Sequence, residues 1–206
     1  MSRALQPLAA AFARRSAKLV ARDLLGRLIV RTLDDGSRLI ARIVETEAYL
    51  GGPDRASHAW DNRRTARNAS LYLPGGHWYV YFIYGMHHCL NVIAGEAETG
   101  GAALIRAAEI IEGGAIAHRH RGLNGPVRPG DLAGGPGRLC KALAIDRTFD
   151  GRNVKDASLR LAHGEAVRDA QVAVGPRIGV DYAGDAALWP LRFAIRGHPE
   201  MSRPRM

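Results

Sequence analysis

Cysteine is scarce in this 206-residue sequence, which contains only Cys89 and Cys140. Two cysteines cannot form a disulfide framework or a cysteine-rich zinc site, so a reducing compartment, the cytoplasm, is expected. Long apolar runs are also missing, since no stretch approaches the roughly 18 consecutive apolar residues of a membrane-spanning helix. The arginine-containing segment 1–26 is interpreted as the start of the folded domain rather than as a targeting peptide. The sequence therefore predicts neither disulfides nor a membrane anchor.

Motifs for metals and nucleotide cofactors are absent as well. The adjacent residues His87 and His88 would point to opposite faces of a strand, so they do not form one metal site. The sequence has no His-Glu-x-x-His motif and no pair of cysteines at zinc-ligand spacing. The "GGPG" at 134–137 matches neither a Walker loop nor a dinucleotide fingerprint. We expect no metal and no cofactor.

Acidic residues are outnumbered, with 20 Asp and Glu against 29 Lys and Arg, for a formal net charge of +9. The excess is uneven: residues 1–70 carry 13 basic and 7 acidic groups, 71–112 carry 1 and 4, and 113–206 carry 15 and 9. Basic flanks around a near-neutral centre favour a polyanionic partner such as nucleic acid or an anionic membrane. Only three of the basic residues are lysines, a bias that genome base composition explains equally well. The excess of positive charge does not depend on that explanation.

The apolar pattern predicts one α+β domain over 1–206, a mostly antiparallel curved sheet with flanking helices. Strands are expected at 27–33, 37–49, 77–85, 87–95, 156–164, 177–180 and 191–197, and helices at 16–26, capped by Ser16, and at 136–145. The run 102–111 suits either a strand or a helix. The glycine- and proline-rich residues 113–137 predict a long surface loop. Residues 1–11 are expected to form a flexible segment and 199–206 a C-terminal tail.

Two carboxylates interrupt the apolar run "IVETEAY" at 43–49. Side chains alternate along a strand, which places Glu45, Glu47 and Tyr49 on one face. A solvent-facing edge strand with surface carboxylates would explain this stretch taken alone. However, eight of the thirteen aromatic residues lie between 49 and 84. Aromatic faces stack on nucleobases, worth about 1 to 3 kcal/mol per base, although an aromatic core strand would account for some of these residues.

A protruding β-hairpin is expected around Gly85 and Met86. Alternation places Tyr79, Tyr81 and Ile83 on one face of its first strand, and Val80, Phe82 and Tyr84 on the other. Tyr84 stands at the tip, where a large aromatic side chain cannot easily reach the core of its own domain. A protruding side chain at this position is suited to wedge into a stack of bases, as in proteins that distort duplex DNA.

Seven segments stand together in order, "RIVETEAYLG", "SHAW", "TARN", "YVYFIYGMHHCLNV", "LIRAAEIIEG", "GPGRLCKALAID" and "PLRFAIRG". In order and spacing they resemble the alkyladenine (3-methyladenine) DNA glycosylase family of mammalian type, also found in bacteria. The resemblance runs from about residue 12 to about residue 198. It implies a monofunctional base-excision repair enzyme that hydrolyses the N-glycosidic bond of an alkylated or deaminated purine, after the base has rotated out of duplex DNA.

The resemblance also implies residue roles. Glu47 matches the acid that activates the attacking water, and Arg106 matches a basic partner of that water. The implied base pocket consists of Tyr49, His58, Tyr81, Asn91 and Ile178, whose main-chain carbonyl is expected to contact the attacking water. Intercalation is implied for Tyr84, with Met86 beside it, and contact with DNA for Arg63, Thr65, Arg67 and His87. His88 and Ala66 depart from the pattern of the family, at positions that concern the DNA-contact surface.

Lysine is absent between Lys18 and Lys141. Bifunctional glycosylases need an amine for a Schiff base, so water is the simpler nucleophile here, with the α-amino group as the alternative. Glu45 is expected either to be structural or to disfavour ionisation of Glu47 by like-charge proximity. The expected partner is double-stranded DNA with a damaged purine, bound by a monomer without an obligate protein partner. Two alternatives are a non-catalytic nucleic-acid-binding module, in which Glu47 has no role, and a hydrolase of small nucleosides.

Overall fold

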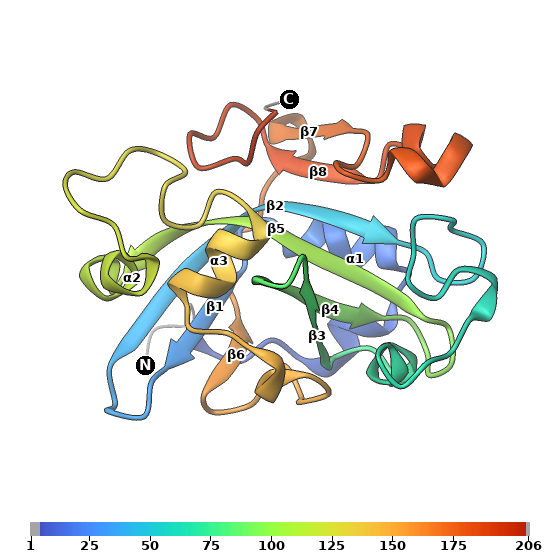
Figure 1. Cartoon of the computed structure of the whole chain (residues 1–206), viewed down its shortest axis with the longest axis horizontal. Helices are drawn as coiled ribbons and strands as arrows, with labels where there is room; N and C mark the ends of the chain where they lie inside the picture. The colour runs from blue at the N-terminus through green and yellow to red at the C-terminus, as the bar shows by residue number, and fades with distance from the viewer. Residues whose placement is uncertain (1–4, 205–206) are drawn as a thin grey trace.

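The long strand β2 (Arg38–Tyr49) runs through the middle of an antiparallel sheet (Figure 1). In this computed structural model, which describes residues 5–204, its first half pairs with β1 (Leu28–Thr32) and its second half with β8 (Arg192–Ile195). The other edge of β2 pairs with β5 (Gly101–Glu112) along nearly its whole length. Glu45 and Glu47 therefore lie in a central strand, and the explanation of a solvent-facing edge strand is wrong.

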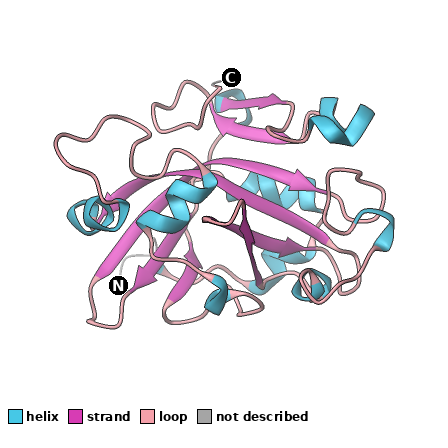
Figure 2. Ribbon diagram, in the orientation of Figure 1, coloured by secondary structure: helices cyan, strands magenta, loops and turns pink. Residues whose placement is uncertain are grey.

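The sheet has eight strands in the order β3-β4-β5-β2-β1-β6, with β8 attached to β2 and β7 attached to β8. The remaining strands are β3 (Trp78–Ile83), β4 (His87–Ala94), β6 (Leu159–Ala162) and β7 (Val172–Gly175). Each strand pairing is antiparallel. Figure 2 shows the strands as the main body of the fold, with short helices set around them. The expected α+β class with a mostly antiparallel sheet is confirmed.

Helix α1 (Ala17–Leu24) lies behind the sheet in Figure 1, and α3 (Pro136–Ala142) lies in front of it. The hydroxyl of Thr46 in β2 donates to the Ala21 carbonyl of α1 at 2.7 Å, and Ala48 is part of the same buried core. One face of β2 thus seals the core beneath α1. The alternate residues, Glu45 and Glu47, face the other side, although two register shifts near Glu45 bend the strand there.

Helix α1 begins and ends where the sequence predicts, but the expected cap by Ser16 is wrong. The helix begins after Ser16, but the Ser16 side chain makes no capping hydrogen bond. It ends before Gly26, whose φ of +80° would strain any other residue, and a Cβ there would lie 2.0 Å from the Glu165 carbonyl oxygen. Glycine is required at this close approach for both reasons.

Two parts of the expected fold need revision, and one open alternative is decided. Residues 113–137 are not loop throughout, because helix α2 (Gly114–Arg121) lies within them and packs on α3. Its flanking glycines, Gly113 and Gly122, adopt left-handed conformations with φ of +81° and +66°, so they end a helix rather than extend a loop. The run 102–111 lies within strand β5. Residues 177–180 are not a strand, and the strand of that region is β7.

The two chain ends pack on the sheet where the structure describes them. The Leu8 amide donates to the Leu161 carbonyl at 3.0 Å, and the Leu8 side chain is buried. Met201 and Ser202 of the expected tail are also buried. Residues 1–4 and 205–206, parts of the expected flexible segment and tail, lie outside the described residues. No helix within residues 5–204 is long and apolar enough to cross a membrane.

Candidate active site

A cavity of about 300 Å³ opens over β3, β4 and β5. It is lined by these predicted site residues: Tyr49, His58, Tyr81, Tyr84, His87, Asn91, Arg106 and Ile178. Tyr79 and Ile83 also line it while Val80 packs in the core, which confirms the alternation expected for β3. The residues therefore come together from five places in the sequence, as a single concave site.

Glu47 lies directly behind the wall of this cavity and has no exposed surface. Its Oε1 accepts the Ile178 amide at 2.8 Å, and its Oε2 accepts the Tyr49 hydroxyl at 2.9 Å. Arg106 Nη1 stands 3.3 Å from Oε1. A carboxylate offers about four acceptor positions, so these three donors leave room for one more, such as a water molecule. All three donor residues line the cavity, although the Glu47 carboxylate itself does not.

Ile178 contacts Glu47 in a way that the sequence did not predict. The Ile178 amide, rather than its carbonyl, holds the carboxylate. The expected contact between the Ile178 carbonyl and a water stays a prediction.

Arg106 lies between the two acids of β2. Its guanidinium is 3.3 Å from Glu47 Oε1 and 3.3 Å from Glu45 Oε1, and only 7% of the residue is exposed. Burial by itself lowers the pKa of Arg106, but the charges of Glu47 and Glu45 outweigh it and raise the pKa above its usual value. Arg106 is therefore a permanent cation shared by the two carboxylates.

Glu45 has a structural environment. It is fully buried, and its Oε1 accepts Arg192 Nε at 2.7 Å and the Ser202 hydroxyl at 2.9 Å. Its Oε2 accepts the Ser202 amide at 2.7 Å. These bonds tie β2 to β8 and to the C-terminal segment, which confirms the structural role among the two that the sequence left open for Glu45.

The aromatic wall opposite Glu47 is electrically neutral. The Tyr81 ring centroid lies 4.6 Å from that of His58 and 5.3 Å from that of Tyr79. His58 Nδ1 is 2.8 Å from the Tyr79 hydroxyl oxygen. Burial, and after it the charge of Arg67, lowers the pKa of His58, so its imidazole is neutral at pH 7. Burial also raises the pKa of Tyr81 well above its usual value, which keeps the phenol protonated.

Tyr49 differs from Tyr81, because the guanidinium of Arg177 lies over its ring, 4.8 Å from the centroid. Burial, and then the charge of Glu47, raises the pKa of Tyr49 well above its usual value. The hydroxyl therefore stays protonated and donates to Glu47. Asn91 is buried beneath the cavity, where its amide nitrogen donates to the Tyr79 carbonyl at 3.0 Å.

Arg177 and Asp54 form a buried pair that the sequence did not reveal. Both side chains are fully buried, and Arg177 Nη2 donates to Asp54 Oδ1 at 2.9 Å. Arg177 also donates to the Ala48 carbonyl in β2 and to the Ala186 carbonyl. The residue thereby joins three segments behind the cavity. No local pattern marks this pair, because its members are 123 residues apart.

The hairpin tip reaches the rim of the cavity and projects from it. Tyr84 is 77% exposed and Met86 is 69% exposed. Tyr84 and Gly85 both have positive φ, +55° and +67°, as in type I′ turns. This turn brings Tyr84 to the rim of the cavity, beside residues of the opposite strand face. The expected protruding hairpin is confirmed.

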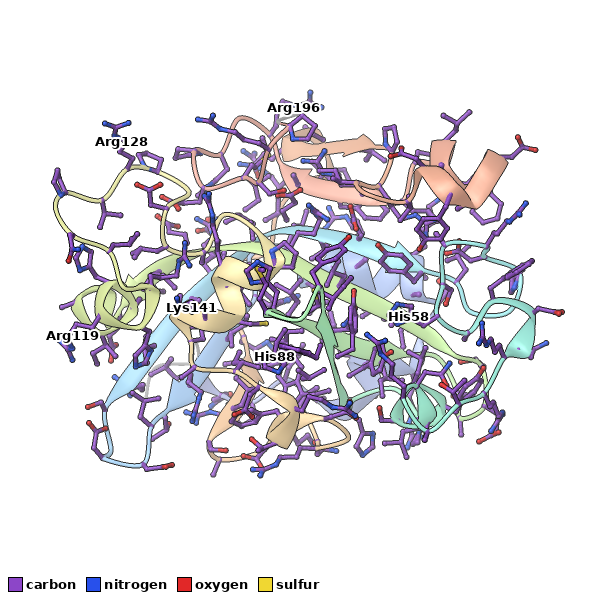
Figure 3. The ribbon with its side chains drawn as sticks, viewed as in Figure 1. His58, His88, Arg119, Arg128, Lys141 and Arg196 are labelled. Atoms are coloured by element: carbon purple, nitrogen blue, oxygen red, sulfur yellow. The ribbon has the colours of Figure 1, made fainter. Side chains whose placement is uncertain are left out.

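The neighbouring histidines of β4 face apart, as expected. His87 lines the cavity and packs closely on Gly137 of α3. His88 lies away from it, against the Phe82 ring with centroids 4.9 Å apart (Figure 3). Among residues 5–204, no group of three or more His, Cys, Asp or Glu side chains is placed to hold a metal ion.

Arg63, Thr65 and Arg67 lie outside the cavity. They line an adjoining hollow that shares His58 and Tyr79 with it. Further basic side chains are exposed around the molecule, at Arg119, Arg128, Lys141 and Arg196 (Figure 3). A cavity with a neutral aromatic wall and arginines in the adjoining hollow is an arrangement suited to an uncharged or cationic ring attached to a polyanion.

The sequence matches the model of the methylpurine-DNA glycosylase family over residues 11–199. A protein of Myxococcus xanthus, named as a 3-methyladenine DNA glycosylase, is 43% identical over 192 residues, which are 93% of this chain and 91% of that protein. A protein of the same name from Anaeromyxobacter dehalogenans is 48% identical over 195 residues, 94% of this chain and 86% of the relative. The DNA-3-methyladenine glycosylase of Mus musculus is 42% identical over 192 residues, 89% of this chain and 57% of the mouse protein. This chain belongs to the methylpurine-DNA glycosylase family.

Proposed function

We propose that this protein is a monofunctional DNA glycosylase, which hydrolyses the N-glycosidic bond of alkylated or deaminated purines in duplex DNA as a step of base-excision repair. One observation carries the proposal. A fully buried carboxylate, Glu47, is held by three groups that line an aromatic cavity: the Ile178 amide, the Tyr49 hydroxyl and the Arg106 guanidinium. A module that only binds nucleic acid would gain nothing from burying an acid at this place, since burial of a charge costs free energy.

The first step is extrusion of the damaged base, because an enzyme cannot reach the glycosidic bond of a stacked base. Unstacking costs a few kcal/mol and costs least for a damaged or mismatched base. The exposed side chain of Tyr84 is placed to occupy the gap left in the stack, while Met86 stands beside it. Arg63, Thr65, Arg67 and His87 are placed to contact the strand next to the cavity.

Base selection follows from the walls of the cavity. A purine alkylated on its ring is cationic, and the face of an aromatic ring attracts a cation by about 0.5 to 2 kcal/mol, depending on desolvation. His58 is neutral and so does not repel that charge. Asn91 lines the cavity, and we expect it to disfavour the exocyclic amine of normal guanine.

Glu47 acts as the general base of the chemical step. The bond between the base and C1′ breaks with its electron pair leaving on the base, so the sugar becomes oxocarbenium-like. A water molecule held at the remaining acceptor position of Glu47 attacks C1′ and gives its proton to the carboxylate. The guanidinium of Arg106, 3.3 Å from Oε1, holds the Glu47 carboxylate in place before attack.

Water is the nucleophile because no lysine amine among the described residues lines the cavity. Lys18 and Lys141 are both exposed, on α1 and α3, and neither lines the cavity. The protein is further proposed to act as a monomer in the cytoplasm, since the cavity and its candidate catalytic residues come from one chain and its two cysteines are free and buried.

The test is the substitution Glu47→Gln, assayed on duplexes that each carry one lesion. We expect excision to fall by about 10²- to 10⁴-fold, the usual contribution of a general base, while affinity for the duplex persists. Glu112→Gln is the matched control, because Glu112 is an exposed glutamate paired with Arg38 at the far end of β5. Excision by Glu47→Gln at the wild-type rate would show that the mechanism is wrong.

A hydrolase of small nucleosides would use similar groups, so the substrate must be tested separately. Activity on a deoxyinosine-containing duplex, without activity on free deoxyinosine, is expected for a DNA glycosylase. Its affinity should also fall steeply with salt, because contacts to phosphates release counterions. Turnover of the free nucleoside at low and high salt alike would favour the nucleoside hydrolase instead.

A further inference from the structure

The residues behind Arg106 include the C-terminal segment of the chain. The Ser202 hydroxyl oxygen lies 3.4 Å from both Nε and Nη2 of Arg106, as an acceptor. The same hydroxyl donates to Glu45 Oε1 at 2.9 Å, and the Ser202 amide donates to Glu45 Oε2 at 2.7 Å. Ser202 is therefore bonded at once to Arg106 and to the carboxylate that competes with Glu47 for it.

Residues 200–204, here called the C-terminal clip, are held on both sides of Ser202. The Pro204 carbonyl accepts Arg192 Nη2 at 2.7 Å, and Arg192 Nε is bonded to Glu45. On the other side, the Glu200 carboxylate accepts the Gly130 amide at 2.8 Å. Ser202 itself is only 3% exposed. The clip is thus fastened to β8 and to the loop after α2, which fixes the position of the Ser202 hydroxyl.

Arg106 has two nearly equivalent anionic neighbours, which makes its position sensitive to small changes. Each carboxylate has its closest oxygen 3.3 Å from the guanidinium. Glu45 receives two hydrogen bonds from Ser202 and one from Arg192, so its charge is already well satisfied. Without the Ser202 hydroxyl, the buried Glu45 carboxylate would lose a donor and would attract Arg106 more strongly, because a buried charge with too few partners is costly.

We propose that the C-terminal clip is a positioning element for catalysis, in which the Ser202 hydroxyl holds Arg106 in place against Glu47. The inference rests on the proposed function, because it concerns the pair that activates the attacking water. Ser202 does not line the cavity, and it acts through Arg106. Its substitution therefore changes the rate of bond cleavage and leaves the affinity for DNA unchanged.

The experiment compares Ser202→Ala with Ser202→Thr, which keeps the hydroxyl, under single-turnover conditions with enzyme in excess over a lesion-containing duplex. We expect Ser202→Ala to lower the excision rate by about tenfold, since a hydrogen bond to a charged group is only partly transmitted to the transition state. The affinity for the duplex should stay at the wild-type value, because Ser202 does not line the cavity. Ser202→Thr should restore the excision rate.

The matched control is Ser70→Ala, which removes a hydroxyl that donates to the Asp150 carboxylate at 2.9 Å and has no bond to Arg106. It should leave the excision rate and the affinity for the duplex as in the wild type. Thermal unfolding of each variant separates loss of folded protein from loss of rate. If Ser202→Ala does not fold, Ser202→Cys replaces it, as a residue of similar size with weaker hydrogen bonds.

A folded Ser202→Ala or Ser202→Cys protein with the wild-type excision rate overturns the inference. That result leaves the proposed function intact, provided that Glu47→Gln abolishes excision. Activity in Glu47→Gln would instead overturn the proposed function itself, whatever the result at Ser202.

Discussion

The buried residues behind the cavity and the hairpin at its rim are built in opposite ways. The buried residues are Glu45, Glu47 and Arg106, here called the floor. They belong to the central strands β2 and β5 and are bonded to fixed partners. At the rim, Tyr84 and Met86 stand on a tight turn beyond β3, the end strand of the sheet, and are largely exposed.

The difference matches the roles proposed for the two regions. A general base works best when its partners are held in place before the substrate arrives, because no reorganisation is then needed during the reaction. A side chain that enters a stack of bases must instead be free to leave the protein surface. Changes on the floor should therefore affect stability and rate together, whereas changes at the rim should affect DNA distortion alone.

Arg106→Gln should give the largest loss of stability among changes to the floor. It leaves Glu45 and Glu47 buried with one cation fewer, and breaking a buried ion pair typically costs about 3 to 5 kcal/mol. Denaturant unfolding should show this loss, together with a lower single-turnover rate. Arg38→Gln, at an exposed pair with Glu112, should change neither. Equal stability of Arg106→Gln and the wild type would contradict a preorganised floor.

Asp54→Asn should weaken the support behind Tyr49. The change keeps the shape of the side chain but leaves the Arg177 guanidinium, which is fully buried, without its anion. We expect the free energy of unfolding to fall by about 3 kcal/mol. Asp61→Asn, at an exposed residue of the same region, is the control. The variant would contradict a structural role for the pair if it unfolded at the same denaturant concentration as the control.

Much of the floor could be placed from the sequence, but its connections could not. Strand alternation correctly put Glu45, Glu47 and Tyr49 on one face, because the period of a strand is a local property. Alternation does not say what that face meets, and Glu45 finds Ser202 157 residues away. The surface-edge explanation failed for this reason, since the pairing of β2 with β5 and β8 depends on distant strands.

The misplaced elements have local causes. Residues 113–137 contain so many glycines that a loop was expected, yet Gly113 and Gly122 act as the two ends of α2. Glycine permits both outcomes, because it adopts positive φ in loops and at helix ends alike. Residues 177–180 were expected to form a strand, but the strand of this region is β7. Short apolar runs do not show which of two neighbouring segments pairs with a strand such as β8. The hairpin, by contrast, is a local structure, and its tip was correctly predicted.

Tyr84→Ala tests the hairpin at the rim of the cavity. Because the side chain is 77% exposed, its removal should leave stability nearly unchanged. The flipped base should be retained less well, by an amount on the order of 1 to 3 kcal/mol for a lost stacking contact. Fluorescence of a reporter base beside the lesion measures the flipping equilibrium. An unchanged equilibrium would remove Tyr84 from the intercalating role, and Met86→Ala would then be the next variant to examine.

His58 gives the smallest effect, in the dependence of stability on pH. Its pKa is lowered in the folded protein from the usual 6.5, mainly by burial, so the unfolded chain binds this proton more readily than the folded one. The contribution of His58 is therefore fully present above pH 6.5 and is lost as the pH falls below it. His198, whose pKa is also lowered by burial, adds in the same direction.

Urea unfolding across this pH range should therefore show stability falling toward acid, with a shallower slope in His58→Asn than in the wild type. His163→Asn is the matched control, because His163 lies after β6, far from the cavity wall. The same slope in His58→Asn and the wild type would mean that His58 does not change its protonation on unfolding. Burial would then not be what keeps this imidazole neutral.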